Sequence, residues 1–266
     1  METKAEDTSA AQARDGKDIQ GIPWERLSLR NFVWVISKHD IYLLSNYSIS
    51  RWSSLTGSRN EILNVKGHVA PSERHPESLL ERFTKTQVST LAVKERLLVA
   101  GGFQGELIFK HLDRPGVSFC SRTTYIENTI TNALYGLISG ALCFMASNND
   151  CGVRDFDMKR YKLVQLFRYP WPVNHSSLSP DGKLVVVIGD DPNGLLVDSS
   201  NRQAIGMLKG HINYSFTSDW YPNGVIFATG NQDKACLIWD TRNLSESVTV
   251  LKANLGSVWS IRFTSD

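Results

Sequence analysis

The stretch that most constrains the fold runs from Lys209 to Asp240 and reads KGHINYSFTSDWYPNGVIFATGNQDKACLIWD. A Gly-His pair opens it and a Trp-Asp pair closes it. Between them lie a Pro-Asn-Gly turn signal, the apolar run 225–229 and Asp233. Apolar runs of this length, separated by turn residues, predict short antiparallel strands. The stretch therefore predicts one unit of an all-β repeat fold, which is a scaffold and does not by itself indicate a chemistry.

Weaker copies of this unit precede it along the chain. Phe156-Asp157 and Val197-Asp198 stand where Trp239-Asp240 closes the best unit. The closing aspartates are 41 and 42 residues apart (157 to 198, and 198 to 240). This spacing lies within the period of about 40–45 residues typical of β-propeller blades of the WD-repeat type. The sequence thus predicts an all-β propeller of four-stranded blades.

The strands expected in these copies follow from β-branched and aromatic runs bounded by turns. They cover residues 88–93, 97–100, 106–112, 141–146, 153–156 and 184–188, with an outer strand at 61–66. Residues 255–263 alternate as an inner strand of a further blade. We therefore expect about five blades plus one strand, over residues 23–266. Residues 1–22 are polar and predict a disordered tail, and 69–84 form a loop insertion with a short helix at 77–83.

Composition narrows the class of function. The aromatic content of 10% allows the chain to bury a large core. The formal charge of +2 gives no strong basic excess that would favour binding of nucleic acid. The N-terminus lacks the apolar core of a signal peptide, and no apolar run reaches the length of about 20 residues that spans a bilayer. The four cysteines form no CxxC pair. We expect a soluble intracellular protein, cytoplasmic or nuclear. We expect it to bind no membrane, no metal and no cofactor.

The chain resembles the WD40-repeat (transducin-like) β-propeller family over residues 31–266. A narrower resemblance is to little-characterised plant and fungal WD-repeat proteins. It rests on DIQGIPWERL (18–27), HVAPSERHPESLLE (68–81), VAGGFQGELI (99–108), SNNDCGVRDFD (147–157), PWPVNHSSLSPDGKL (170–184) and FATGNQDKACLIWDTRNL (227–244). This resemblance implies seven blades in full-length relatives, a truncated form here, and a first blade that lacks an inner strand.

The family resemblance also implies a structural tetrad of His211, Thr229, Asp233 and Trp239, joined by hydrogen bonds from indole to hydroxyl to imidazole to carboxylate. A catalytic Ser/Thr–His–Asp triad is the alternative interpretation of the same residues. The other blades replace tetrad positions with apolar residues: Phe156 and Val197 for the tryptophan, and Ala146 and Val187 for the threonine. No other cluster of histidines, carboxylates or glycines predicts a catalytic, phosphate or metal site.

The leading functional interpretation is a non-catalytic scaffold that binds other proteins, with the insertion 69–84 and segments 168–173 and 190–194 as candidate recognition loops. An alternative rests on Trp239, Asp240 and Arg242 as partner-binding residues. The window 226–242 resembles the WDxR box by which some WD-repeat proteins dock the adaptor of cullin-4 ubiquitin ligases, with Arg242 as the exposed cation. A propeller hydrolase is a third alternative.

Overall fold

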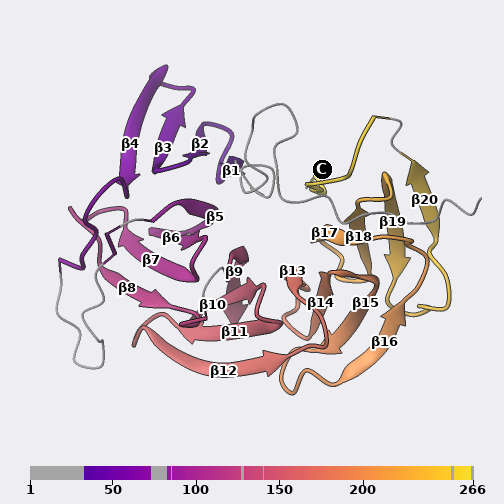
Figure 1. Cartoon of the computed structure of the whole chain (residues 1–266). Helices are drawn as coiled ribbons and strands as arrows, with labels where there is room; N and C mark the ends of the chain where they lie inside the picture. The colour runs from indigo at the N-terminus through magenta and orange to yellow at the C-terminus, as the bar shows by residue number, and fades with distance from the viewer. Residues whose placement is uncertain are drawn as a thin grey trace, which may run out of the picture.

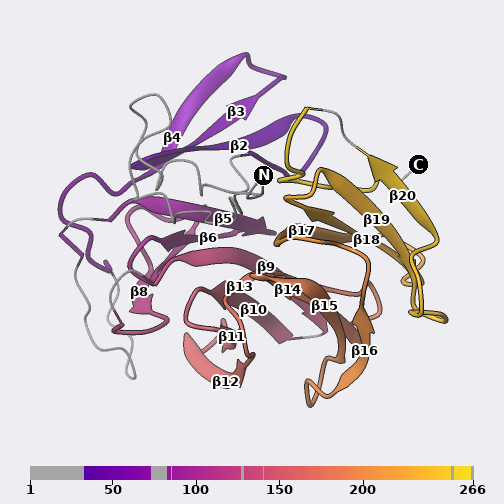
Figure 2. The same cartoon turned by 45° about the vertical axis from the view of Figure 1, so that its right-hand side comes forward.

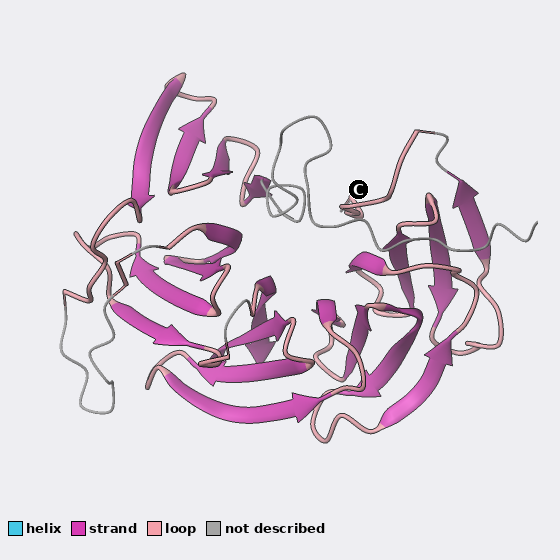
Figure 3. Cartoon of the chain, in the orientation of Figure 1, coloured by secondary structure: helices cyan, strands magenta, loops and turns pink. Residues whose placement is uncertain are grey.

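A computed structural model describes residues 33–72, 83–84, 86–126, 129–139, 141–252 and 255–264. The described residues form five four-stranded antiparallel sheets, and none of them is helical (Figure 3). Each sheet is one blade, and the blades follow one another in chain order around a common centre (Figure 1). The predicted all-β propeller of four-stranded blades is therefore confirmed.

The blades are built from consecutive strands, in the order in which the chain runs. Blade 1 holds β1 (Val33–Val35), β2 (Asp40–Ser45), β3 (Ser48–Ser53) and β4 (Ser58–Asn64), and blade 2 holds β5 (Val88–Lys94), β6 (Leu97–Gly102), β7 (Glu106–His111) and β8 (Phe119–Arg122). Blade 3 holds β9 (Thr131–Ser139), β10 (Ala141–Asn148), β11 (Gly152–Asp157) and β12 (Lys162–Arg168). Blade 4 holds β13 (Val173–Leu178), β14 (Leu184–Gly189), β15 (Asp191–Asp198) and β16 (Ala204–Leu208), and blade 5 holds β17 (Ser215–Trp220), β18 (Ile226–Asn231), β19 (Ala235–Asp240) and β20 (Thr249–Lys252).

The hydrophobic core lies between the blades. Four clusters of buried side chains fill the four contacts between successive blades. Their central members include Ile49, Phe109, Val187 and Trp239, each no more than 1% exposed. Burial of one such side chain contributes about 1.5–3 kcal/mol. Each blade is therefore stable mainly through its neighbours, as in other repeat proteins.

Polar side chains also tie the inner strands of successive blades together. Ser89 Oγ donates to the carbonyl of Thr131 at 2.6 Å, Asn132 Nδ2 donates to Val173 O at 2.9 Å, and Asn174 Nδ2 donates to Ser215 O at 3.1 Å. The partners are 42, 41 and 41 residues apart. The sequence period therefore reappears as a repeated bond from β5 to β9, β9 to β13 and β13 to β17.

Two strand predictions were wrong in detail. The first blade has an inner strand, the three-residue β1, where the family resemblance implied none. Residues 255–263 do not form a strand, because no ladder pairs with them in the described chain. They lie instead along β17, where Trp259 stacks on Phe216 at 4.1 Å and the Phe263 amide donates to Asp219 Oδ2 at 2.8 Å.

Other predictions fall partly or wholly outside the described residues. The tail 1–22, residues 23–32, and the 77–83 helix except Phe83 lie outside the described residues. The ends of the 69–84 insertion are described: Val69 pairs with Phe83, and Pro71 forms a parallel bridge to Val117 beside β8. The described part of the chain contains no helix with the length and apolar character of a membrane-crossing segment.

Candidate functional site

Blade 5 brings His211, Thr229, Asp233 and Trp239 into one chain of hydrogen bonds. Trp239 Nε1 donates to Thr229 Oγ1 at 2.9 Å, His211 Nε2 lies 2.9 Å from the same hydroxyl, and His211 Nδ1 lies 2.9 Å from Asp233 Oδ2. Every proton has an acceptor if the hydroxyl donates to Nε2 and Nδ1–H donates to the carboxylate. Thr229 is 1% exposed and already accepts a bond from Trp239. The arrangement therefore links strands β18 and β19 to the connection before β17. Because the Thr229 hydroxyl is buried and already bonded, a substrate cannot reach it.

A turn of the same construction holds Asp150 in blade 3, which the sequence reasoning missed. In blade 5 the Asp233 amide donates to Asn231 Oδ1 at 2.8 Å, and the Ala235 amide donates to Asp233 Oδ1 at 2.9 Å. In blade 3 the Asp150 amide donates to Asn148 Oδ1 at 3.3 Å, and the Gly152 amide donates to Asp150 Oδ1 at 3.1 Å. The shared Asn-x-Asp spacing, NQD and NND, was the available signal.

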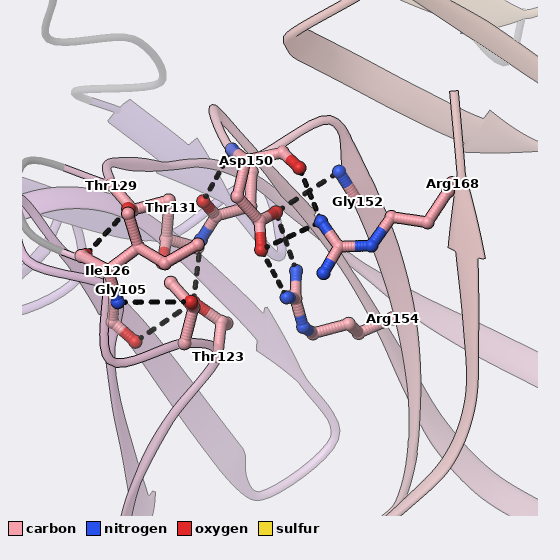
Figure 4. A network of polar contacts seen from close by, with 11 residues as sticks. Gly105, Thr123, Ile126, Thr129, Thr131, Asp150, Gly152, Arg154 and Arg168 are labelled. Carbon is pink, nitrogen blue, oxygen red and sulfur yellow. Dashed lines mark hydrogen bonds and ion pairs between the residues drawn. The ribbon is translucent and has the colours of Figure 1, made fainter. Parts of the chain in front are cut away.

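Asp150 differs from Asp233 in its partners, because arginines replace the histidine. Arg154 Nη1 donates to Asp150 Oδ1 at 2.9 Å and its Nη2 donates to Oδ2, while Arg168 Nη1 lies 3.3 Å from Oδ2 (Figure 4). Burial by itself would raise the pKa of Asp150, but the Arg154 hydrogen bond and both guanidinium charges hold it below its usual value. This turn is therefore fastened by a buried ion pair.

In blade 2 the corresponding turn is held by a hydrogen bond to Glu106. Gly102 occupies the place of Asn148 and Asn231, and the Gln104 amide donates to Glu106 Oε2 at 2.7 Å. A Cβ on Gly102 would lie 2.3 Å from that oxygen, so a larger residue there would displace the Glu106 carboxylate. Burial raises the pKa of Glu106, against the opposing hydrogen bonds and the Arg122 charge. The GGFQG stretch is thus a strand-connecting turn.

A second buried ion pair joins blade 3 to blade 4 and was also missed. Arg202 Nη2 donates to Asp155 Oδ2 at 2.6 Å, and its guanidinium lies 4.9 Å from the centre of the Phe167 ring. Burial raises the pKa of Asp155, and the Arg202 charge opposes that rise. Arg202 and Asp155 are 47 residues apart, so no local pattern reveals the pair.

The three proposed partner-binding residues have very different environments. Trp239 is completely buried in the hydrophobic cluster between blades 4 and 5, so its side chain offers no surface to a partner in this structure. Asp240 and Arg242 form a bidentate pair, with Arg242 Nε 2.9 Å from Asp240 Oδ1 and Nη2 2.6 Å from Oδ2. The Arg242 hydrogen bonds lower the pKa of Asp240 to about 2. The Arg242 side chain is 77% exposed, so one edge of its guanidinium faces solvent.

Several exposed apolar side chains lie on one rim of the propeller, here called the inter-blade rim. It consists of the connections between blades and the turns between the second and third strands of each blade. These meet, because the Gln232 amide donates to Tyr214 O at 2.9 Å and the Asn149 amide donates to Ile130 O at 3.1 Å. Its exposed members are Tyr47, Tyr125, Ile126, Ile212, Tyr214 and Leu255. Figure 2 shows these connections from a second direction.

The candidate recognition segments 168–173 and 190–194 lie on this rim but are only partly accessible. In segment 168–173, Trp171 and Val173 are buried, which leaves Arg168 and Pro170 exposed. In segment 190–194, Asp191 begins β15 and accepts a bond from the Asn193 amide at 2.8 Å. Among the described residues, no group of three or more His, Cys, Asp or Glu side chains could hold a metal ion.

Comparison with known proteins identifies the fold as that of a WD40 β-propeller. The WD40 propeller domain of Doa1 superposes with a TM-score of 0.62 at 13% identity, covering 88% of this chain and 85% of that one. A chain in the crystal structure of the mitotic checkpoint complex superposes with a TM-score of 0.68 at 12% identity, covering 85% of this chain and 66% of that one. No protein-family profile matches the chain.

Two curated proteins are similar in sequence over shorter stretches. Uncharacterized protein C4G3.03 of Schizosaccharomyces pombe is 25% identical over 128 residues, which are 45% of this chain and 37% of the yeast protein. EARP-interacting protein 1 of Caenorhabditis elegans is 28% identical over 100 residues, which are 37% of this chain and 26% of the nematode protein. The chain thus matches about a third or less of the length of either relative.

Proposed function

We propose that this chain is a non-catalytic scaffold that binds other proteins through its inter-blade rim. The observation that carries the proposal is the division between buried and exposed side chains. Residues with catalytic potential, such as Thr229 and His211, are buried in structural hydrogen bonds, whereas Ile212 and Tyr214 beside them are 83% and 44% exposed. Aromatic and large apolar side chains are those that carry binding energy at protein interfaces.

Three further findings bear on this proposal. The nematode relative is named for an interaction with EARP, which makes EARP-type assemblies one candidate class of partner. The yeast relative is a fungal protein, which agrees with the fungal part of the narrower resemblance. The cysteines at 120, 143, 151 and 236 are all free, which fits a reducing compartment such as the cytoplasm or nucleus.

Affinity purification with quantitative mass spectrometry tests the rim. The double variant Ile212→Ser/Tyr214→Ser is compared with wild type and with Leu55→Ser, a matched control because Leu55 is 73% exposed on the opposite rim. We expect the rim variant to lose partners that both other proteins retain. Identical partner sets for all three proteins would refute binding through the inter-blade rim.

The narrower alternative is docking to the adaptor of a cullin-4 ubiquitin ligase through Arg242. The exposure of the guanidinium supports it, although Asp240 already occupies one edge and an adaptor carboxylate would have to use the other. A pull-down of the adaptor with Arg242→Ala tests it. Arg96→Ala is the control, since Arg96 is also 77% exposed and paired with an aspartate. Equal recovery by the two variants would count against Arg242.

A further inference from the structure

One face of blade 5 is not stacked against another blade in the described chain. Trp220 and Phe227 face blade 4 in the shared hydrophobic cluster, whereas Asp219 and Gly230 lie on the opposite face, because side chains alternate along paired strands. Residues 257–263, here called the strap, cross this outward face without forming a strand. The strap therefore covers the kind of surface that a neighbouring blade covers elsewhere in the ring.

The side chains of the strap fit closely onto the outward face. Trp259 stacks on Phe216, with ring centroids 4.1 Å apart and ring planes 4° from parallel. A Cβ built on Gly230 would lie 2.6 Å from Val258 Cγ1 and 2.9 Å from Ile261 Cδ1. The glycine therefore leaves the space into which these two aliphatic side chains pack.

The backbone of the strap is held at two points. The Val258 amide donates to Asn231 O at 3.0 Å, and the Phe263 amide donates to Asp219 Oδ2 at 2.8 Å. No ladder of hydrogen bonds joins the strap to a strand among the described residues, and Trp259 remains 41% exposed. Segments with few hydrogen bonds and partly exposed side chains open at a lower free energy than the sheets beside them. We therefore expect the strap to leave blade 5 without unfolding the blade.

The strap also reaches blade 1. The Arg262 guanidinium lies 5.8 Å from the centre of the Trp34 ring on β1, within the range of a cation–π contact. Burial raises the pKa of Asp219, and the Phe263 amide and the Arg262 charge oppose that rise. In Figure 1 the yellow segment that follows β20 runs back toward the side of the ring where β1 lies. Arg262 thus connects an acidic side chain of blade 5 to an aromatic ring of blade 1.

We propose that the strap is a releasable clasp, which occupies a docking face on blade 5 and links that blade to blade 1 through Arg262. Its release uncovers a surface for an extended protein segment with the chemistry of the strap itself. Such a segment offers an aromatic ring to Phe216, aliphatic side chains to Gly230 and a backbone amide to Asp219. The inference goes beyond the proposed scaffold function, because it concerns a second face of the molecule and the control of access to it.

A permanent structural role is the competing explanation. The same contacts would then only stabilise blade 5, and the strap would open together with the strands beneath it. Hydrogen exchange separates the two explanations, because locally opening amides exchange faster than those that need unfolding of the whole unit. The amides of Val258 and Phe263 report on the strap, and those of β18 report on the blade.

The first experiment measures amide protection factors in the purified full chain. For wild type we expect protection of Val258 and Phe263 at least tenfold below that of β18. Arg262→Gln, which removes the cation, should lower the protection of the two strap amides by about threefold and leave β18 unchanged. Arg242→Gln is the matched control, since Arg242 is an exposed arginine of the same blade that pairs with Asp240. It should leave the strap amides unchanged.

The second experiment tests the link to blade 1 from the other side. Because coupling between two sites is reciprocal, Trp34→Leu should lower the protection of the Phe263 amide by the same factor as Arg262→Gln. Trp34 also donates to Val93 O at 2.9 Å, so its replacement loosens blade 1 for a second reason. The double variant resolves this ambiguity. With a direct contact between the two side chains, it should lose no more strap protection than Trp34→Leu alone.

The third experiment supplies the strap as a separate molecule. A fluorescein-labelled peptide with the sequence of residues 256–264, GSVWSIRFT, is titrated against wild type and against Trp259→Ala/Arg262→Gln. Fluorescence anisotropy should show at least fivefold tighter binding to the variant, whose own strap is released. A peptide with alanine in place of the tryptophan is the control and should bind neither protein. Unchanged protection of β18 verifies that blade 5 of the variant remains folded.

Three outcomes would overturn the inference. They are strap amides as protected as β18, additive effects of Arg262→Gln and Trp34→Leu, or a peptide that binds the variant no more tightly than wild type. None of these outcomes bears on the inter-blade rim, which Ile212→Ser/Tyr214→Ser tests separately.

Discussion

Replacement of Asp150 by asparagine should destabilise the protein far more than the same change at the surface. The side chains of Asp150 and Arg154 are 2% and 3% exposed, and two hydrogen bonds join them. Asparagine has nearly the same shape and can still accept from the Gly152 amide, but it leaves the Arg154 charge buried without a counter-charge. Removal of one partner of a buried pair costs about 3–5 kcal/mol.

The surface pair Arg96–Asp113 is the matched control. Its atoms are 2.8 Å apart, but the side chains are 77% and 51% exposed. Solvent screens such a pair, so Asp113→Asn should cost less than about 1 kcal/mol. At about 2–4 °C per kcal/mol for a chain of this size, Asp150→Asn should lower the Tm by about 6–20 °C, and Asp113→Asn by about 4 °C or less.

Urea unfolding followed by circular dichroism measures both variants, with Arg154→Met and the double variant completing a mutant cycle. The charge left by either single change is removed in the double variant, so its loss should be at least about 1 kcal/mol smaller than the sum of the single losses. Strict additivity, or equal losses for Asp150→Asn and Asp113→Asn, would refute the view that burial makes this pair important.

Two further predictions concern the other buried polar groups. Trp239→Phe removes the indole donor to Thr229 and part of a fully buried ring. We therefore expect the free energy of unfolding to fall by about 2 kcal/mol with an unchanged urea m-value. A fall of less than about 0.5 kcal/mol would contradict the structural role of the tetrad. For Glu106→Gln we predict a pH effect. Because burial raises the folded-state pKa of Glu106, wild type binds this proton more readily when folded. Wild type should therefore gain stability relative to Glu106→Gln as the pH falls from 7 towards 4.5, in parallel urea titrations; a constant difference would show that the pKa is not raised.

Much of the fold is predictable because it depends on local patterns. The runs 88–93, 97–100, 141–146 and 184–188 all lie within observed strands, since β-branched residues between turn residues favour extended backbone in almost any context. The inner strand predicted at 255–263 failed for a reason that is not local: alternation makes a strand possible, but a ladder needs a second chain segment beside it. The short β1 was not expected because the family resemblance implied a first blade without an inner strand.

The candidate site was less predictable than the fold. The positions of His211, Thr229, Asp233 and Trp239 follow from the repeat, and the hydrogen bonds among them are seen. The residues that hold the corresponding turns in other blades have different partners. In blade 3 the aspartate pairs with arginines, and in blade 2 a glutamate from the following strand accepts a hydrogen bond from the turn. An arginine in place of the histidine does not alter the alternation of apolar residues in the strands. The sequence pattern therefore does not reveal which side chain pairs with the aspartate.

The sequence by itself determined the class of the fold, the period of its repeat and the best-formed blade, because each depends on residues close together in the chain. Only the tertiary structure decided which side chains are available to a partner. Trp239 is buried while Arg242, three residues later, is exposed, and Asp155 is paired with Arg202 from the next blade. The physical reason is that Trp239 is buried by its contact with blade 4, and the Asp155–Arg202 pair joins residues 47 positions apart, so neither depends on neighbours in the sequence.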